Sequence, residues 1–285
     1  MSSTTVAQLS IAQALQAAGA LGLERLDAQL LLLHALGRPA HERAWLLAHD
    51  TDLLAAPVQI QLRDLCSRRA AGEPLAYLVG EKEFFGLPLA VDARVLVPRP
   101  DTETLVEWAL ERLAGQPAPT VLDLGTGSGA IALALQHARP DAQVTAVDAS
   151  AGALEVARGN AARLGLPVRF LQGDWCAALD SAERYDLIAS NPPYIAVADG
   201  HLAALVHEPL SALAAGADGL DDLRRIITQA PAHLAAGGWL LLEHGWDQAA
   251  LVRELLQAAG FAEVQSRKDL AGIERCSGGL LPSHR

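Results

Sequence analysis

Residues 121–135 read V-L-D-L-G-T-G-S-G-A-I-A-L-A-L, and this stretch decides the fold. The apolar run before the glycines predicts a buried strand, and the small and apolar residues after them predict a helix. Gly125, Gly127 and Gly129 allow unusual backbone dihedrals and a close approach of the backbone to a ligand. In an open parallel sheet, ligands bind beyond the carboxyl ends of the strands. The stretch therefore predicts a strand, a turn and a helix with a nucleotide-like ligand at the turn; a tight turn without a ligand is the alternative.

Strand-like and helix-like segments alternate around this unit. Strands are expected at Thr120–Leu124, Gln143–Val147, Val168–Leu171, Leu187–Ser190 and Trp239–Glu243, and helices at about 102–114, 128–138, 150–164, 220–235 and 247–259. Near-continuous apolar strands separated by helices are typical of a parallel sheet covered on both faces, so the fold class is α/β. Ala262–Arg267 and Ile273–Gly278 predict two more strands without a helix between them. At least one of these two strands is therefore expected to run antiparallel, at the edge of the sheet.

The first part of the chain has a different composition. Residues 5–71 are rich in Ala, Leu and Gln, and the spacing of Leu26, Leu30 and Leu33 places them on one face of a helix. The following segment contains short extended runs with turn signals, which predict a β-hairpin. We therefore expect a helical domain at 1–78, a hairpin connector at 79–100 and an α/β domain at 101–285, whose first helix has Asp101 or Thr102 as its N-cap.

The composition excludes several classes of protein. The chain has 285 residues, of which 51% are apolar, and a net charge of −11. This charge disfavours binding to nucleic acid, which needs clustered Lys and Arg against the phosphates. No 18-residue uncharged apolar run and no signal-type segment are present, so neither a membrane span nor secretion is expected. Cys66, Cys176 and Cys276 lie far apart and the histidines are scattered, which favours free thiols in a reducing cytoplasm and no metal site.

Three side chains near the predicted strand ends suggest the kind of ligand. Asp148 ends the second strand about 20 residues beyond the glycines, where an acid can accept hydrogen bonds from ribose hydroxyls; a helix N-cap is the alternative. Asp123, just before the glycines, is placed to meet a cation. Trp175 offers a flat surface to adenine, although core packing is nearly as consistent with the sequence. The G-x-G-x-G spacing differs from the dinucleotide motif and lacks the Lys of a phosphate loop. Together these features favour S-adenosylmethionine over NAD or ATP.

The strand at 187–190 ends in Asn191-Pro192-Pro193-Tyr194. Two prolines cannot continue a strand, because neither can donate a backbone hydrogen bond. Asn191 Oδ1 and the Pro192 carbonyl can each accept one N–H of a planar NH₂ group, and Tyr194 can stack on the substrate. These contacts would hold the nitrogen in line with a methyl group and favour the localised lone pair needed for attack. A rigid strand-to-loop turn is the alternative interpretation.

In this order and spacing, D-L-G-T-G-S-G, V-D, G-D-W and N-P-P-Y resemble a class I S-adenosylmethionine-dependent methyltransferase that modifies a planar nitrogen. More closely, the chain resembles the HemK (PrmC) family, the protein-(glutamine-N5) methyltransferases of peptide chain release factors. The resemblance covers nearly the whole length, with P-L-A-Y-L-V-G at 74–80, F-F-G-L at 84–87, V-P-R-P-D-T-E at 97–103, E-P at 208–209, D-G-L at 218–220 and L-L-L-E-H-G-W at 240–246. The N-P-P-Y motif alone is shared with DNA adenine methyltransferases, whereas this combination is specific.

The resemblance implies a Rossmann-like, seven-stranded, mostly parallel sheet, with a small all-α N-terminal domain joined to it by the hairpin. It implies a cytoplasmic enzyme that methylates the glutamine of a Gly-Gly-Gln loop in class 1 release factors, modulates translation termination and forms S-adenosylhomocysteine. The helical domain would help to dock this protein substrate. The residues implied to bind S-adenosylmethionine are Asp123, Gly125, Thr126, Gly127, Ser128, Gly129, Asp148, Trp175 and Asn191. Those implied to bind the glutamine are Asn191, Pro192, Pro193 and Tyr194, with Asn191, Pro192 and Tyr194 acting in catalysis.

The sequence departs from the family pattern at two places. Asp101 stands where the family usually has Glu, and Val206-His207 replaces an Arg-aromatic pair before Glu208-Pro209, which bears on docking of the release factor. Four alternatives remain: a glutamine methyltransferase of a large-subunit ribosomal protein, a nucleic-acid amino (adenine N6-type) methyltransferase, a non-catalytic nucleotide-binding adaptor and a nicotinamide oxidoreductase. The L-L-L-E-H-G-W segment favours release factors over the ribosomal protein. The net charge disfavours the nucleic-acid methyltransferase, the intact N-P-P-Y disfavours the non-catalytic adaptor, and the glycine spacing disfavours the oxidoreductase.

Overall fold

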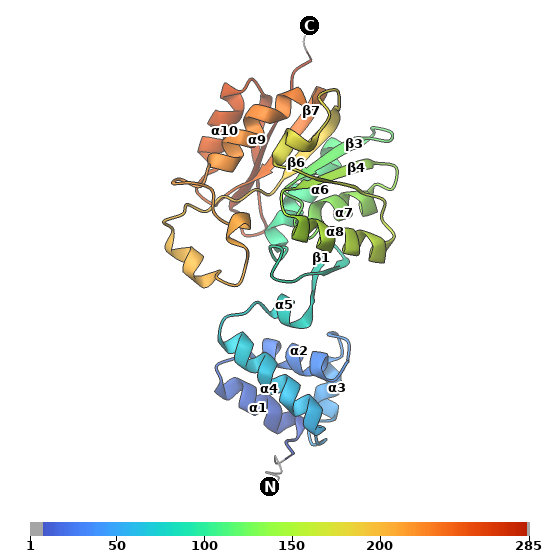
Figure 1. Ribbon diagram of the computed structural model, residues 1–285, viewed down its shortest axis with the longest axis vertical. Helices are drawn as coiled ribbons and strands as arrows, with labels where there is room; N and C mark the ends of the chain where they lie inside the picture. The colour runs from blue at the N-terminus through green and yellow to red at the C-terminus, as the bar shows by residue number, and fades with distance from the viewer. Residues whose placement is uncertain (1–7, 284–285) are drawn as a thin grey trace. The chain divides into compact units, whose positions relative to one another are not determined.

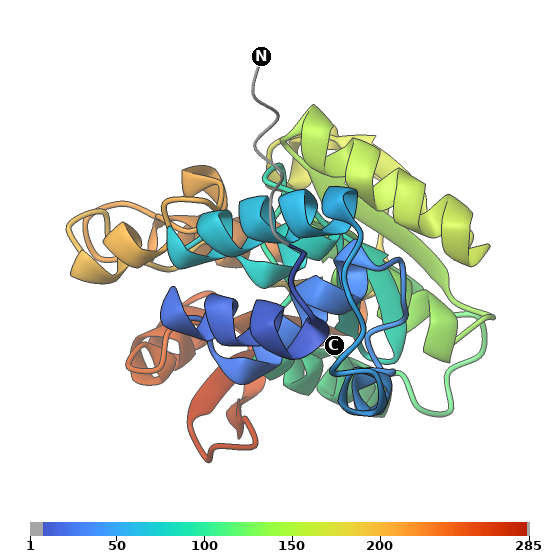
Figure 2. The same cartoon turned by 90° about the horizontal axis from the view of Figure 1, so that it is seen from below.

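The computed structural model describes residues 8–283 and divides at Gly80 into two compact units. The first unit is helical (blue to cyan in Figures 1 and 2) and contains α1 (Ile11–Ala20), α2 (Arg25–Ala35), α3 (Arg43–Ala48), α4 (Ala56–Ala70) and α5 (Leu75–Val79). A capping box begins α1: Ser10 Oγ accepts from Gln13 N, and Gln13 Oε1 accepts from Ser10 N. These two bonds satisfy backbone donors that the first turn leaves open.

Helix α2 is the central helix of the first unit, because it packs against α1, α3, α4 and α5. Leu31, Leu32 and Leu33 are all fully buried. Three consecutive residues point in different directions around a helix, so their burial requires neighbours on several sides. Leu26, Leu30 and Leu33 all lie in α2, as their spacing predicted. Leu33 is buried, whereas Leu26 is 46% exposed.

The second unit begins with an antiparallel hairpin of β1 (Glu81–Phe84) and β2 (Leu87–Ala90). Its turn residues Phe85 and Gly86 have φ of 51° and 79°, as a two-residue hairpin turn with two positive φ angles requires. Asn160 in α8 (Ala151–Leu164) receives a hydrogen bond from Ala90 N at 2.7 Å and donates one to Ala90 O at 3.0 Å. The hairpin is thus held against the second unit.

A seven-stranded sheet forms the centre of the second unit, in the order β5-β4-β3-β6-β7-β9-β8. The strands are β3 (Thr120–Leu124), β4 (Gln143–Asp148), β5 (Arg169–Gln172), β6 (Tyr185–Ser190), β7 (Leu234–Glu243), β8 (Ala262–Lys268) and β9 (Glu274–Leu280). The first five in this order are parallel, which confirms the mostly parallel sheet. The antiparallel strand is β9, and it lies inside the sheet rather than at its edge, because it pairs with β7 on one side and β8 on the other.

Helices cover both faces of the sheet (Figure 1) and enclose two apolar cores. One core includes α6 (Glu103–Arg112) and α7 (Ala130–Ala138), and the other includes α9 (Asp221–Gln229) and α10 (Ala249–Ala258). The helix expected at 220–235 ends at Gln229, and a 3₁₀ turn follows at Ala230–Ala232. Pro231 lies in that turn, where its missing N–H and its ring disfavour a continued α-helix.

Within residues 8–283, no helix has the length and apolar character needed to cross a membrane. Cys66, Cys176 and Cys276 are free and buried.

Candidate active site

The parallel strands end together at one edge of the sheet. β3 pairs in register with β4 and β6, and β6 with β7, almost to the carboxyl end of each strand. Residues that end or directly follow these strands therefore come close in space, although they are far apart in the chain: Gly125, Asp148, Asn191 and Glu243.

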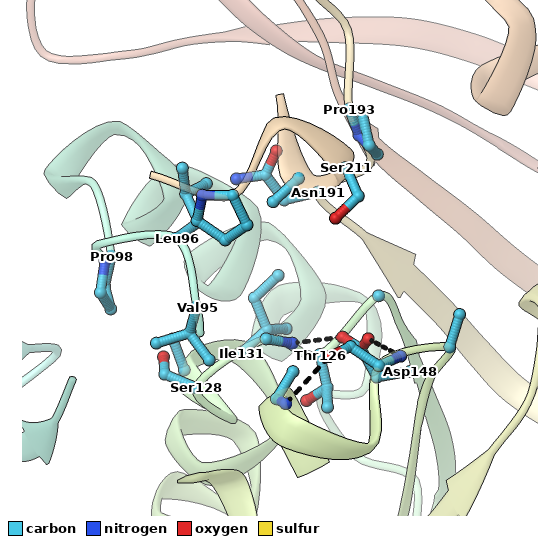
Figure 3. A pocket seen from close by; sticks show the side chains of 18 of the residues that line it. Val95, Leu96, Pro98, Thr126, Ser128, Ile131, Asp148, Asn191, Pro193 and Ser211 are labelled. Carbon is cyan, nitrogen blue, oxygen red and sulfur yellow. Dashed lines mark hydrogen bonds between the residues drawn. The ribbon is translucent and has the colours of Figure 1, made fainter. Parts of the chain in front are cut away.

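A cavity of about 310 Å³ lies at this edge (Figure 3). Its lining brings together eight residues proposed from the sequence: Gly125, Thr126, Gly127, Ser128, Asp148, Trp175, Asn191 and Pro193. Four others lie outside the lining: Asp123, Gly129, Pro192 and Tyr194. The cavity therefore joins the glycine turn to the N-P-P-Y segment.

The glycine turn has a backbone that few other residues adopt. Gly125, Gly127 and Gly129 have φ of 73°, 55° and 87°. A Cβ atom built on Gly125 would lie 3.1 Å from Cζ3 of the Trp175 ring, which is tighter than most real contacts. Glycine at this position thus allows both the positive φ and the close approach of the indole to the turn.

Asp148 holds the glycine turn through hydrogen bonds and can still accept further ones. Its Oδ2 accepts a hydrogen bond from Gly127 N, and its Oδ1 accepts one from Ser150 N, each at 2.9 Å. A carboxylate oxygen has two acceptor sites, so each oxygen can accept a further bond from a ribose hydroxyl. The side chain that caps α8 belongs to Ser150, whose Oγ accepts from Ala153 N.

Trp175 is held in place by an acid that the sequence analysis missed. Its Nε1 donates to Asp222 Oδ1 at 3.1 Å, and both side chains line the cavity. Burial raises the pKa of Asp222 above its ordinary value. Trp175 also packs against the apolar core that includes α9 and α10. The indole therefore both packs in the core and lines the cavity, so the two interpretations from the sequence are compatible. In the sequence, Asp222 resembles any acid in the first turn of a helix.

Asp123 lies beneath the glycine turn and is fully buried. Its Oδ2 accepts from Thr126 Oγ1 at 2.6 Å and from Ala132 N at 3.2 Å. Its Oδ1 has no hydrogen-bond partner among the residues that the structure describes. Burial raises the pKa of this carboxyl to about 7. These contacts indicate that Asp123 supports the turn from below.

The N-P-P-Y segment leaves two acceptors available. Asn191 Nδ2 donates to Thr102 Oγ1 at 3.2 Å, whereas no hydrogen bond to Asn191 Oδ1 or to the Pro192 carbonyl occurs within residues 8–283. Tyr194 is held from two sides: its hydroxyl donates to Glu243 Oε1 at 3.4 Å, and its carbonyl accepts from Gln248 Nε2 at 3.0 Å. No described residue thus engages the amide oxygen or the proline carbonyl, whereas the phenol is engaged within the protein.

Sequence reasoning also missed Glu243 and the role of Thr102. Burial raises the pKa of Glu243 to about 7, and the charge of Arg275 acts against this rise. The available signal was the acid at the end of the apolar run L-L-L-E. Burying a carboxyl costs free energy unless the group is hydrogen-bonded or paired, so an acid in a buried strand suggests a structural or functional role. Thr102 is the N-cap residue of α6, as one of the two expected candidates, but its side chain makes no capping hydrogen bond.

A buried acid ties the loop after the N-P-P-Y segment to the opposite wall of the cavity. Glu208 Oε2 accepts from Val97 N at 3.1 Å, and Glu208 Oε1 forms an ion pair with Arg99. Arg99 and Pro209 both line the cavity. Val206, the first residue of the Val206-His207 pair that departs from the family pattern, is 71% exposed.

Comparison with known proteins accounts for both units. Residues 7–80 match the family model of the PrmC N-terminal domain, and residues 102–264 match that of the Methyltransferase small domain. The release factor glutamine methyltransferase of Bordetella pertussis is 57% identical over 262 residues, which cover 91% of this chain and 96% of the relative. The protein of the same name from Burkholderia pseudomallei is 53% identical over 268 residues, covering 91% and 93%.

Solved structures share the fold at low identity. A methyltransferase from Pyrococcus furiosus has a TM-score of 0.55 at 20% identity and covers 76% of this chain and 100% of its own. The hMettl16 catalytic domain has a TM-score of 0.58 at 18% identity, covering 77% and 84%.

The fold, the cavity and the matched models together define an S-adenosylmethionine-dependent methyltransferase of the class I type. The curated relatives narrow this class, because they are more than half identical over nine-tenths of the chain. The chain belongs to the family of release factor glutamine methyltransferases, HemK/PrmC.

Proposed function

We propose that this protein transfers a methyl group from S-adenosylmethionine to the side-chain amide nitrogen (N5) of the glutamine in the Gly-Gly-Gln loop of class 1 release factors. This reaction takes place in the cytoplasm and modulates translation termination. The curated relatives carry this activity in their name, which supports the proposal. The structural observation that carries it is that Asn191 lines the glycine-turn cavity and that no described residue donates to Asn191 Oδ1 or to the carbonyl of the adjacent Pro192.

The donor set of the cavity fits S-adenosylmethionine. Asp148 retains acceptor sites for the ribose hydroxyls, and the indole of Trp175 offers a flat face beside the Gly125 turn for the adenine. Asp174 and Asp222 add carboxylates to the lining, and Arg225 forms ion pairs with both. When bound, S-adenosylmethionine supplies an electrophilic methyl group on a sulfonium.

The N-P-P-Y segment would position the substrate amide. Asn191 Oδ1 and the Pro192 carbonyl each accept one N–H of the glutamine NH₂, which fixes the direction of its nitrogen lone pair. Two acceptors also stabilise the positive charge that develops on this nitrogen as the new bond forms. The methylated nitrogen is much more acidic than the amide, so its proton can leave without a strong base. Pro193 lines the cavity and stiffens the segment.

The helical domain at 1–78 orients the release factor over the cavity in this proposal, and the hairpin at 79–100 connects it to the catalytic domain at 101–285. Deletion of residues 1–78 should abolish methylation of the intact release factor while binding of S-adenosylhomocysteine is retained. Retained binding shows that the catalytic part still folds. Undiminished methylation by a shortened protein with normal binding would remove the docking role.

One experiment tests the substrate directly. The protein is incubated with methyl-labelled S-adenosylmethionine and, separately, with a release factor, its Gly-Gly-Gln→Gly-Gly-Ala variant, a large-subunit ribosomal protein and duplex DNA. We expect label only on the release factor with the intact glutamine. Label on the ribosomal protein or the DNA instead would overturn the proposed substrate, and absence of label on all four would overturn the proposed activity.

A further inference from the structure

We infer that Asn160 and Glu208 are positioning residues that fasten one wall of the cavity at its two ends, Asn160 on the side of the glycine turn and Glu208 on the side of the N-P-P-Y segment. This wall is formed by residues 90–99, here called the wall segment. The inference deepens the proposed function, and its substrate half rests on that function. Its cofactor half rests on the S-adenosylmethionine site alone.

The wall segment depends on side-chain anchors because it has little regular structure. Ala90 is the last residue of β2, and a 3₁₀ turn begins only at Pro100. Five residues of the segment line the cavity (three of them labelled in Figure 3): Arg94, Val95, Leu96, Pro98 and Arg99. Backbone groups that lack a partner in a helix or strand must find one elsewhere when they are buried. Two buried polar side chains from distant parts of the chain provide such partners.

Asn160 joins the first residue of the wall segment to the glycine turn, and its side chain is fully buried. Its Oδ1 accepts from Ala90 N at 2.7 Å, and its Nδ2 donates to Ala90 O at 3.0 Å and to Ser128 O at 2.9 Å. The two protons of one amide thus reach both the wall segment and the turn. Because Ser128 lines the cavity, Asn160 fixes the distance between the wall segment and the turn that binds S-adenosylmethionine.

Glu208 joins the other end of the wall segment to the loop that follows N-P-P-Y. Its Oε2 accepts from Val97 N at 3.1 Å, its Oε1 pairs with Arg99, and its side chain is only 3% exposed. A buried carboxylate is stable only where donors meet its oxygens, and here each oxygen has one. The contact therefore requires the loop and the wall segment to be in their present positions together.

The loop that carries this carboxylate begins and ends beside the N-P-P-Y segment. Ile195 follows that segment directly and pairs with Ala214 in a parallel bridge, so the chain between them returns to its starting point. The loop contributes three residues to the cavity lining: Pro209, Ser211 and Ala212. Pro209 directly follows Glu208, so a shift of Glu208 would move this lining relative to Asn191.

Calorimetry with S-adenosylhomocysteine tests Asn160 in the full chain. Asn160→Asp keeps the shape of the side chain and the acceptor for Ala90 N, but it loses both donated bonds. We expect the Kd to rise by about tenfold, because two buried carbonyls lose their donor. Asn160→Ala tests the same loss without a buried charge if Asn160→Asp does not fold. An unchanged Kd in a folded Asn160 variant would remove its role.

Glu155→Gln is the matched control. Glu155 lies in α8, like Asn160, and pairs with Arg94 of the wall segment at 2.9 Å, but both side chains are exposed. Exposed ion pairs contribute little, so the Kd of S-adenosylhomocysteine and the kinetics should stay at the parent's values. This control separates the buried anchors from contacts with the wall segment in general.

Kinetics with the release factor at saturating S-adenosylmethionine test Glu208. In Glu208→Gln the amide NH₂ would face either Val97 N or Arg99, so one of these donors loses its acceptor. We expect kcat/KM for the release factor to fall by about ten- to a hundredfold, because the substrate glutamine is misplaced. The Kd of S-adenosylhomocysteine should stay close to that of the parent. Glu208→Ala tests the same contact if Glu208→Gln does not fold.

The pattern across the variants decides the inference, because a general loss of packing would not separate the two readouts. Weaker cofactor binding in the Asn160 variants, with slower methylation but normal cofactor binding in the Glu208 variants, supports it. Equal losses of both readouts at both positions, or normal kinetics in a folded Glu208 variant, would overturn it. A parent protein that methylates no release factor would instead overturn the proposed function, and calorimetry would still decide the role of Asn160.

Discussion

The indole Nε1 of Trp175 donates a hydrogen bond to Asp222 Oδ1 at 3.1 Å, and this bond joins the turn after β5 to the first turn of α9. The same indole lies against the Gly125 turn. The side of the cavity that the indole forms is therefore held by residues from three separate segments, of which only two were apparent in the sequence.

Trp175→Phe removes this hydrogen bond and keeps an aromatic face. We expect the Kd of S-adenosylhomocysteine to rise by about two- to tenfold, because one neutral-to-charged hydrogen bond that orients the ring is lost. Isothermal titration calorimetry measures the change. Asp222→Asn, which retains an acceptor oxygen, is the matched control and should weaken binding less. Unchanged affinity in Trp175→Phe would show that the bond does not orient the ring for the ligand.

Asp148→Asn should weaken binding of S-adenosylhomocysteine by about tenfold or more, since an amide has one acceptor oxygen for two backbone donors. Its NH₂ would face either Gly127 N or Ser150 N, which both donate to Asp148 in the parent. Asp141→Asn, on the exposed surface, is the control and should bind normally. Equal affinities in the two variants would contradict a ribose-binding role for Asp148.

Gly219→Ala should displace the N-P-P-Y segment. A Cβ at this position would lie 2.2 Å from the Tyr194 carbonyl oxygen, and the φ of +75° is unfavourable for alanine. We expect kcat to fall by about tenfold or more and the protein to be less stable, because backbone atoms must move. Gly200→Ala is the matched control, as its Cβ would meet nothing within 4 Å. If the two variants had the same kcat, a fixed position of the segment would not matter for the reaction.

The stability of the protein should depend on pH through Asp123. Burial raises the folded-state pKa of Asp123 to about 7, whereas an unfolded Asp has a pKa of about 3.9. Between these values the folded state binds a proton that the unfolded state has released, so this group's contribution to stability is present at low pH and is lost as the pH rises through about 7.

Asp123→Asn removes this titration. The free energy of unfolding of the variant relative to the parent should therefore increase as the pH is raised from about 5 to about 8. Urea unfolding at several pH values measures the difference, in which the titration of Glu243 cancels because both proteins contain it. A difference that stays constant with pH would contradict the raised pKa.

Patterns within the chain predicted much of the second unit. Gly125, Asp148 and Asn191 follow or end apolar strands, and parallel strands bring their carboxyl ends to one edge, so their proximity could be predicted. The position of β9 could not be predicted in the same way. Its antiparallel direction could be predicted because no helix separates the last two strands in the sequence. Its place between β7 and β8 depends on pairing with a distant strand.

Side-chain contacts between segments that are far apart in the chain could not be predicted from the sequence. Thr102 and Asn191 are 89 residues apart, and Trp175 and Asp222 are 47 residues apart. Thr102 had a sufficient local explanation as a helix cap, and Asp222 as an acid at a helix start, so neither suggested a second role. The exposure of Leu26 was also not predictable, since helical spacing alone does not tell which side of α2 its neighbours leave open.

The most direct measurement is a crystal structure of the protein with S-adenosylhomocysteine and a release factor fragment that contains the Gly-Gly-Gln loop. We predict that the glutamine side-chain nitrogen lies within hydrogen-bonding distance, about 2.7–3.2 Å, of both Asn191 Oδ1 and the Pro192 carbonyl oxygen. The sulfur of S-adenosylhomocysteine should face that nitrogen from the side of the Gly125 turn. A glutamine bound elsewhere, or held with its oxygen rather than its nitrogen toward these two acceptors, would contradict the account.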